Sequence, residues 1–447
     1  MIDPSLVHTT LRQHQLADGL PFVLDLDRSH GVWLHDAKSG REYLDAYTFF
    51  ASWPIGFNHP LMKDAAFQRE LLRAAEHNPT NADLYTREMA AFVDAFGTRA
   101  TPPSHRWHFW VGGGALAVEN ALKAAFDWKA KKLGRSSMDA DVDDLVVLHF
   151  REAFHGRSGY TLSLTNTDPN KVGLFPKFRW PRIHNPKLEF ALDGSVANDV
   201  EASERQALAE IEAAYARHGN KIASILIEPL QSEGGDNHFR PEFLRALRRI
   251  ADERESMLVF DEVQTGFYGS GTRWLWQQMG VAPDLVAFGK KTQVCGFYSN
   301  DRVTEVEQHV FAKPGRINST WGGNLVDMVR CRRLIEICEA EKLHENIARE
   351  GAFVVAGLRE LARARGAFGN VRGIGSLVAF TLGSPDEREA WLARLLEHGV
   401  LALRTGPQAI RFRLPLILSN AEARELLRRV EACIPARAQV GAAGSAR

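Results

Sequence analysis

The chain has 447 residues and a formal net charge of zero, because its 55 basic side chains equal its 55 acidic ones in number. This balance argues against a broad electrostatic surface for nucleic acid or for an anionic membrane, so we expect small-molecule or protein partners. The length exceeds that of a usual single domain, which favours one large domain and one smaller domain.

The sequence shows no pattern of a membrane span or a secretory leader. No apolar run approaches the roughly 18 residues that a span needs, and no apolar segment flanked by positive charge stands near the N-terminus. We therefore expect a cytoplasmic protein without a membrane partner. The four cysteines contain no C-x-x-C pair, which disfavours a zinc site or a disulfide framework, and we predict no metal.

The first two thirds of the chain divide into an irregular segment and a regular one. Residues 1–61 are irregular apart from a hairpin predicted over 31–45, where Ser39 and Gly40 supply the turn, and we assign this segment to the small domain. Residues 62–324 alternate apolar strand-like runs with amphipathic helical stretches. That alternation is typical of a mainly parallel sheet wrapped by helices, and it defines the large domain.

The C-terminal part reads as a smaller α+β domain over residues 325–435. Its predicted elements are one long helix over 325–364, strands near 376–382 and 409–413, and a last helix over 421–432. Residues 436–447 are poor in large apolar side chains and are predicted to be disordered.

Three apolar runs of the large domain end in a charged residue. These runs precede Glu228, end at Asp261, and lead through a glycine to Lys290. The segment 241–254, between the first two, has apolar residues at helical spacing and is the expected crossover between parallel neighbours. Because ligands of open α/β sheets bind at the carboxyl ends of the strands, this edge is where we expect the site.

Lys290 and Asp261 suggest an amine and a carboxylate that face one cofactor. The amine of Lys290 is placed to form a Schiff base with an aldehyde cofactor, and Asp261 to pair with a protonated pyridine nitrogen. Each residue also has an ordinary interpretation, since a loop lysine is usually solvated and an acid after a strand often caps a helix.

Two segments have the residue types for holding a flat phosphorylated ligand. The glycines of 112–114 precede a strong helix-forming run, so free amides at the helix start suit a phosphate, although a simple tight turn is the commoner meaning. Phe154 offers a ring for stacking and Arg157 a guanidinium for a carboxylate.

Three further segments are ambiguous by themselves. The hydroxyls of Ser319 and Thr320, after Asn318, suit phosphate or a capping turn. Arg411 alternates with apolar residues on a strand and shares its face with the next arginine, which is typical of a solvated face. Glu233 lies on a glycine-rich loop and is either functional or a plain surface acid.

Long blocks at 113–129, 155–167 and 287–296, together with the segments above, resemble the class III, fold type I pyridoxal-phosphate aminotransferases from the first hairpin to the last helix. The resemblance implies an α/β fold, with a mainly parallel seven-stranded sheet in the large domain and a smaller α+β domain. It implies pyridoxal 5'-phosphate as cofactor and a homodimer.

The resemblance also implies the roles of the cofactor-binding residues. Lys290, six residues after the strand-starting Asp284, would carry the Schiff base, with Lys291 as the fallback, and Asp261 would pair with the pyridine nitrogen. Thr320 would reach the phosphate of the neighbouring subunit's cofactor. The full set implied to bind the cofactor is Gly114, Ala115, Phe154, His155, Glu228, Asp261, Val263, Gln264, Lys290, Ser319 and Thr320.

The three blocks are most similar to members that transfer the side-chain amino group of L-lysine to 2-oxoglutarate, giving 2-aminoadipate 6-semialdehyde and L-glutamate. The implied substrate-binding residues are Arg157, Glu233, Gln264, Asn318 and Arg411. Arg157 and Arg411 would hold substrate carboxylates, and Glu233 would pair with Arg411 when lysine is bound and move aside for the dicarboxylate.

Several alternatives stay open at this point. Another class III reaction would use ornithine, 4-aminobutyrate or acetylornithine as donor, and an aminomutase would need no keto acid. A chain that retains the fold without the chemistry, as a binding or scaffold protein, is a hypothesis of a different class. A nucleotide-binding α/β protein is disfavoured because no G-x-G-x-x-G or Walker pattern covers the glycines at 112–114.

Overall fold

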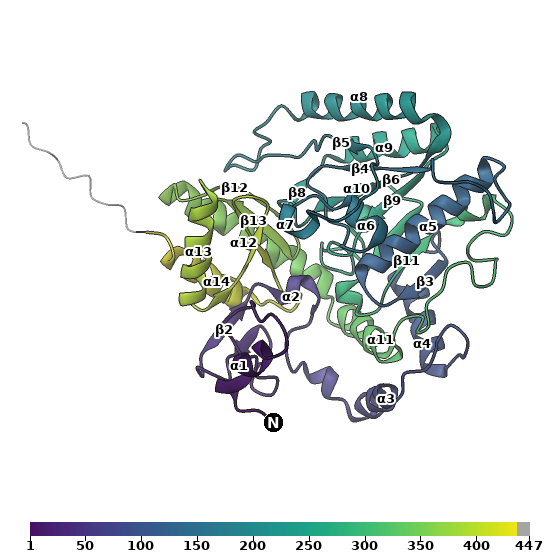
Figure 1. Ribbon diagram of the computed structural model, residues 1–447. Coiled ribbons are helices and arrows are strands. Elements are labelled where there is room, and N and C mark those ends of the chain that lie inside the picture. The colour runs from purple at the N-terminus through teal and green to yellow at the C-terminus, as the bar shows by residue number, and fades with distance from the viewer. Residues whose placement is uncertain (436–447) are drawn as a thin grey trace, which may run out of the picture.

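The computed structural model describes residues 1–435, and the predicted tail 436–447 lies outside the described residues (Figure 1). Within residues 1–435 the largest sheet has seven strands in the order β3-β11-β10-β9-β6-β4-β5. Their bounds are β3 Trp107–Val111, β4 Val146–Phe150, β5 Arg182–Ile183, β6 Ile222–Ile227, β9 Met257–Asp261, β10 Leu285–Phe288 and β11 Cys295–Ser299. Strand β11 runs antiparallel to both neighbours and the other strands are parallel, so the predicted α/β fold with a mainly parallel sheet is confirmed.

The central strands bury both faces because helices cover both sides of the sheet. One side of the sheet packs on α5 (Gly114–Lys132), through residues such as Val147, Leu226 and Val259. The opposite side packs on α8 (Val200–His218) and α9 (Pro241–Glu253), through Leu148, Ile225 and Leu258. Side chains alternate between the two layers, as the period of a strand requires, which explains why these strands read as continuous apolar runs.

Helix α5 owes its close approach to the sheet to small side chains. It buries Ala117, Ala121, Ala124 and Ala125 with no exposed surface. Alanine is the best helix former and adds little bulk between the two backbones. The helix starts just after the carboxyl end of β3, and its small side chains let it cross the middle of the sheet at close range (Figure 1).

The C-terminal part contains a four-stranded antiparallel sheet within the described residues, in the order β12-β13-β16-β15. Its strands are β12 Gly369–Ile374, β13 Leu377–Thr381, β15 Leu403–Thr405 and β16 Ala409–Arg413, and its helices are α12 Leu343–Arg365, α13 Pro385–Glu397 and α14 Asn420–Ala432. The predicted strands at 376–382 and 409–413 and the last helix are confirmed.

The N-terminal hairpin joins this C-terminal part. Strands β1 (Trp33–His35) and β2 (Glu42–Asp45) pair antiparallel, as predicted, and β2 pairs in parallel with β14 (Val400–Leu401). These contacts place the N-terminal hairpin beside the C-terminal part of the chain (Figure 1). The division at residues 61 and 324 remains our proposal, and this strand pairing supports it.

The prediction of one continuous helix over 325–364 is wrong. Helix α11 (Leu325–Ala340) ends before α12 begins, and Lys342 between them has a φ of 52°. A left-handed residue breaks the helical hydrogen-bond ladder, and sequence periodicity on both sides of it does not reveal the break.

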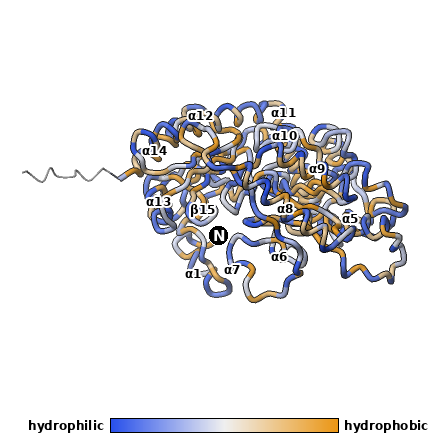
Figure 2. The backbone as a smooth tube through the Cα atoms, turned by 90° about the horizontal axis from the view of Figure 1, so that it is seen from above, coloured by the Kyte–Doolittle hydropathy of each residue, from blue (hydrophilic) through white to orange (hydrophobic). Residues whose placement is uncertain are grey.

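The remaining elements are short or lie at the edges of the two parts. They are η1 Pro4–Leu6, α1 Val7–Arg12, α2 Thr48–Ala51, η2 Pro60–Lys63, α3 Ala65–Glu76, α4 Arg87–Ala95, η3 Phe96–Ala100, α6 Gly159–Leu164, α7 Pro169–Val172, η4 Gly219–Lys221, β7 Leu230–Gln231, β8 Asn237–His238, α10 Leu275–Met279, η5 Lys290–Thr292 and η6 Asp301–Glu305. Hydrophobic and hydrophilic residues alternate along helices such as α12 and α14 (Figure 2). Among the residues described, no helix has both the length and the apolar character to cross a membrane.

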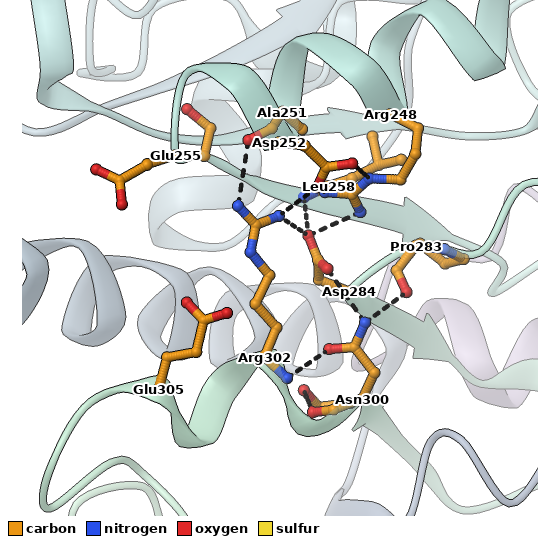
Figure 3. A network of polar contacts seen from close by, with 12 residues as sticks. Arg248, Ala251, Asp252, Glu255, Leu258, Pro283, Asp284, Asn300, Arg302 and Glu305 are labelled. Carbon is orange, nitrogen blue, oxygen red and sulfur yellow. Dashed lines mark hydrogen bonds and ion pairs between the residues drawn. The ribbon is translucent and has the colours of Figure 1, made fainter.

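A polar network fixes the amino ends of the central strands, away from the expected site. Asp284 accepts hydrogen bonds from the backbone of Leu258 at 2.8 Å and from Asn300 at 3.1 Å, and it pairs with Arg248 at 2.9 Å and Arg302 at 3.0 Å (Figure 3). This acid therefore ties β9, β10, α9 and η6 together, and it holds the strand whose other end carries Lys290.

Candidate active site

A cavity of about 280 Å³ lies at the carboxyl edge of the seven-stranded sheet. It is lined by Gly114, Ala115, Phe154, His155, Gly156, Arg157, Glu228, Glu233, Asp261, Val263, Gln264 and Lys290. Every lining residue except Gly156 is a candidate site residue of the sequence analysis. The structure thus brings together segments that follow four strands, β3, β4, β6 and β9, with Lys290, the second residue after β10.

The two consecutive lysines after β10 point to different places. Lys290 has a φ of 56° and lines the cavity. Lys291 is 2 % exposed, and its Nζ donates to the carbonyl oxygens of Gln264, at 2.5 Å, and Gly266, at 3.2 Å. Burial lowers the pKa of Lys290 to about 8, although the neighbouring Asp261 raises it. Lys290 is therefore the amine that a ligand in the cavity meets, and Lys291 holds the loop after β9.

Asp261 is oriented by a histidine. His155 Nδ1 lies 2.8 Å from the Asp261 Oδ2, and the backbone amide of Val263 donates to Oδ1 at 3.0 Å. The acid is 5 % exposed and His155 is 3 % exposed. A buried carboxylate without a cationic partner is costly, so a protonated nitrogen that entered the cavity would stabilise it.

Glycines open the cavity at the start of α5. Gly113 has a φ of 97° and provides no side-chain cap, so the first amides of this 19-residue helix are open toward an anion. A Cβ at Gly114 would lie 3.0 Å from Val263 Cγ1, and a Cβ at Gly156, whose φ is 125°, would lie 2.5 Å from that of Ala115. A side chain at either position would displace Val263 or Ala115, which line the cavity.

Glu228 and Gln264 line the cavity and also form hydrogen bonds to neighbouring segments of the chain. The carboxylate of Glu228 accepts from the amides of Phe154 at 3.0 Å and Ser232 at 3.1 Å. Burial raises the pKa of Glu228 to about 7. The side-chain oxygen of Gln264 accepts from Arg413 Nε at 3.2 Å.

The two arginines of β16 are buried instead of solvated. Arg413 is 0 % exposed and forms a double ion pair with Asp236, at 2.7 and 2.5 Å. Arg411 is 2 % exposed, and its Nε and Nη1 have no hydrogen-bond partner among residues 1–435. Burial, together with the charge of Arg413, lowers the pKa of Arg411 to about 10. An unpaired buried guanidinium marks a place where an anionic group of a ligand would be stabilised.

Glu233 contacts α7 instead of Arg411. Its carboxylate pairs with Lys171 Nζ and accepts from Thr167 Oγ1 at 2.9 Å. Arg157 lines the mouth of the cavity and is exposed to solvent. Arg157 and Glu233 therefore line the same cavity, whereas Arg411 is not among its lining residues and acts on Lys290 through its charge.

Asn318, Ser319 and Thr320 are not among the residues that line the cavity of their own chain. Asn318 and Thr320 are exposed, and Ser319 accepts a hydrogen bond from the amide of Gly322 at 3.1 Å. Trp321 beside them leaves 47 % of its surface exposed.

Sequence reasoning missed Lys171, Thr167 and Asp236. The resemblance implies no role for any of the three, and each acts through a partner more than 60 positions away. Only the glycines at 234 and 235 signalled that the loop before Asp236 has an unusual path.

The residues of the cavity fit a flat aldehyde cofactor with a phosphate and a pyridine nitrogen. The open amides of α5 suit the phosphate, buried Asp261 suits the ring nitrogen, Phe154 and Val263 lie in the cavity wall, and Lys290 presents the amine. Among the described residues no group of three or more His, Cys, Asp or Glu side chains is arranged to hold a metal ion. The four cysteines are buried and unpaired within the same part of the chain.

The fold and this site define a pyridoxal-phosphate-dependent aminotransferase of fold type I. The sequence profile described as aminotransferase class-III matches residues 16–434, so the chain belongs to the class III aminotransferases. It is 48 % identical over 434 residues to the L-lysine-epsilon aminotransferase of Mycobacterium tuberculosis, covering 97 % of this chain and 96 % of that one.

Two further relatives agree with this family. The L-lysine-epsilon aminotransferase of Streptomyces clavuligerus is 47 % identical over 438 residues, covering 97 % of this chain and 95 % of that one. The solved structure of lysine aminotransferase from M. tuberculosis superimposes with a TM-score of 0.93 at 47 % identity, covering 97 % of this chain and 99 % of that chain.

Proposed function

We propose that this enzyme transfers the side-chain amino group of L-lysine to 2-oxoglutarate, forming 2-aminoadipate 6-semialdehyde and L-glutamate. The observation that carries the proposal is the near full-length identity of 48 % to a relative named for the lysine reaction. Lys290 and Glu233 line one cavity, and the buried Arg411, whose charge acts on Lys290, has guanidinium nitrogens without a partner among the described residues, which suits such a pair of substrates.

Pyridoxal phosphate, when bound, supplies an electron sink for the negative charge that develops on the substrate carbon as a proton leaves it. Lys290 would be the residue that holds the cofactor covalently, and its amine, once released, would accept the proton that leaves the substrate carbon. Asp261 would hold the ring nitrogen in its protonated form, and His155 holds Asp261 in the orientation that this task needs.

The two substrates differ in the group that faces Arg411. The α-carboxylate of 2-oxoglutarate would pair with this buried arginine, and Arg157 would hold the second carboxylate. L-Lysine presents an ammonium group for reaction and one carboxylate, which Arg157 would hold. Arg411 then needs another anion, and Glu233 would supply it.

We propose a homodimer in which Thr320 reaches the cofactor phosphate of the neighbouring subunit, with Asn318 and Ser319 on the same segment. The position of this segment outside the cavity of its own chain and the exposure of Trp321 support the proposal.

The first test supplies the purified enzyme with L-lysine and 2-oxoglutarate and measures glutamate and the cyclised semialdehyde together. We expect equal amounts of both products. Glutamate without the semialdehyde, from ornithine, 4-aminobutyrate or acetylornithine in a parallel donor screen, would assign a different class III donor. Conversion of an amine without any keto acid would indicate an aminomutase.

A further inference from the structure

The charge of Glu233 acts on two cations, Lys171 and Arg411, and the carboxylate contacts only Lys171. Its carboxylate is 20 % exposed and pairs with Lys171 of α7, while Thr167 donates to the same oxygen at 2.9 Å. Arg411 is 2 % exposed and has two guanidinium nitrogens without a partner in the described chain. The carboxylate of Glu233 therefore pairs with the more exposed of the two cations and leaves the buried one without a contact.

The backbone of Glu233 is fixed, so only its side chain is free to change partner. The amide of Gly406 donates to the Glu233 carbonyl at 2.9 Å, and Thr405 Oγ1 donates to the carbonyls of Ser232, at 2.7 Å, and Glu233, at 3.2 Å. A Cβ at Gly234 would lie 1.8 Å from the Glu152 carbonyl oxygen, which shows how closely the loop packs on its neighbour. The choice between Lys171 and Arg411 thus depends on side-chain torsions.

Lys171 lies near a residue of the cavity wall as well as pairing with Glu233. Its Nζ lies 5.7 Å from the centre of the Phe154 ring, and Phe154 lines the cavity. The Lys171 ammonium therefore has an aromatic face and a carboxylate as neighbours, which together keep it in place while solvent reaches it from one side.

We propose that Lys171, with Thr167, is a specificity-determining latch that holds Glu233 away from Arg411 and so sets the balance between a dicarboxylate and a monocarboxylate substrate. The latch rests on the proposed function, because that function requires one pocket to accept both 2-oxoglutarate and lysine. Holding Glu233 on Lys171 leaves Arg411 free for a substrate carboxylate. Without Lys171, Glu233 turns to Arg411 and competes with that carboxylate.

The test measures equilibrium binding of glutarate, a dicarboxylate that cannot react, to the holoenzyme by calorimetry. Lys171→Met is expected to weaken glutarate binding about fivefold, as for a partly exposed charge pair. Lys171→Arg should restore binding, and Thr167→Val should weaken it in the same direction but less. The matched control is Lys221→Met, which removes a lysine that pairs with Asp144 at 2.9 Å beside the amino ends of β4 and β6, and it should leave glutarate binding unchanged.

A double-mutant cycle shows whether Lys171 acts through Glu233. In a Glu233→Gln background, Lys171→Met should no longer change glutarate binding. Unchanged binding in Lys171→Met alone, a loss that persists in the Glu233→Gln background, or a wild-type enzyme that binds no glutarate would each overturn the latch. Turnover of lysine is measured separately. Loss of the lysine reaction with the binding effects intact would refute the proposed donor and leave the latch standing.

Discussion

The two lysines after β10 have different tasks although they are adjacent. Lys290 faces the cavity, whereas Lys291 donates to two backbone carbonyls of the loop that carries Val263 and Gln264. A backbone φ of 56° at Lys290 turns its side chain away from that of its neighbour. Because their contacts differ, a variant of either lysine serves as the matched control for a variant of the other.

Replacing Lys290 by alanine is expected to lower kcat on the order of a thousandfold or more, because the proton-transferring amine is lost. Replacing Lys291 by methionine should leave kcat within about tenfold but lower the free energy of unfolding by about 1–3 kcal/mol, because two buried carbonyls lose their donor. Steady-state kinetics and urea unfolding of both variants measure the two effects. A dead Lys291→Met enzyme with normal stability would contradict this assignment.

Cofactor uptake should depend on pH through Lys290. The neutral amine is the nucleophile, and its pKa of about 8 lies below the ordinary lysine value because the site is buried. The uptake rate of cofactor-free enzyme should therefore rise about tenfold per pH unit below the pKa and level off above it. Stopped-flow absorbance follows the uptake.

The charges around Lys290 decide where that midpoint lies. Asp261, Glu228 and Glu233 raise its pKa, and Arg411 lowers it. Arg411→Met should therefore move the midpoint to higher pH. A midpoint that stays in place would show that another group controls uptake.

At the scale of elements, the cavity depends on close contact between the start of α5 and the loop after β4. Gly156 makes this contact at a φ of 125°, where an added Cβ would lie 2.5 Å from the Ala115 Cβ. Gly156→Ala is expected to weaken cofactor binding about tenfold and to lower the free energy of unfolding by about 1–3 kcal/mol, through overpacking and strain.

Cofactor titration and urea unfolding measure the two effects of Gly156→Ala. Gly369→Ala is the matched control, because a Cβ there meets nothing within 4 Å. Equal behaviour of the two variants would show that the loop adapts to a side chain.

At the scale of the whole molecule, one buried ion pair joins the C-terminal sheet to the site. Arg413 of β16 pairs with Asp236 and also donates to Gln264 in the cavity wall. Asp236→Ala leaves the Arg413 charge buried and unpaired, which should cost about 3–5 kcal/mol in the free energy of unfolding. Glu242→Ala, which removes an exposed pair with Arg245, should cost less than about 1 kcal/mol. Urea unfolding compares them, and similar losses would contradict the role of the buried pair.

The proposed dimer makes a prediction about mixed subunits. Thr320→Val alone should lower turnover about tenfold, for loss of a hydrogen bond to a charged group. When Lys290→Ala and Thr320→Val chains are co-expressed, each hybrid dimer has one site with Lys290 and Thr320 both intact, so activity should exceed that of either parent. Activity no higher than the average of the parents would place Thr320 in its own subunit's site or outside catalysis.

Much of the fold and of the site could be predicted from the sequence, because the relevant signals are local. Each signal predicts one element: apolar runs of strand length predict strands, the helical spacing of 241–254 predicts a helix, and the glycines predict the start of α5. The carboxyl-edge rule then places Glu228, Asp261 and Lys290 at one cavity without knowledge of any other contact. The break at Lys342 escaped prediction because the apolar periodicity continues on both sides of it.

The sequence alone was sufficient to predict that Glu228, Asp261 and Lys290 meet at one edge of the sheet, since the carboxyl ends of parallel strands lie together. Only the folded structure determines which charged side chains pair with each other. That Lys290 and not Lys291 faces the cavity, that Arg413 pairs with Asp236, and that Glu233 turns to Lys171 instead of Arg411 all depend on contacts between segments far apart in the chain. The physical reason is that burial sets the cost of leaving a charge unpaired, and burial is a property of the packed molecule.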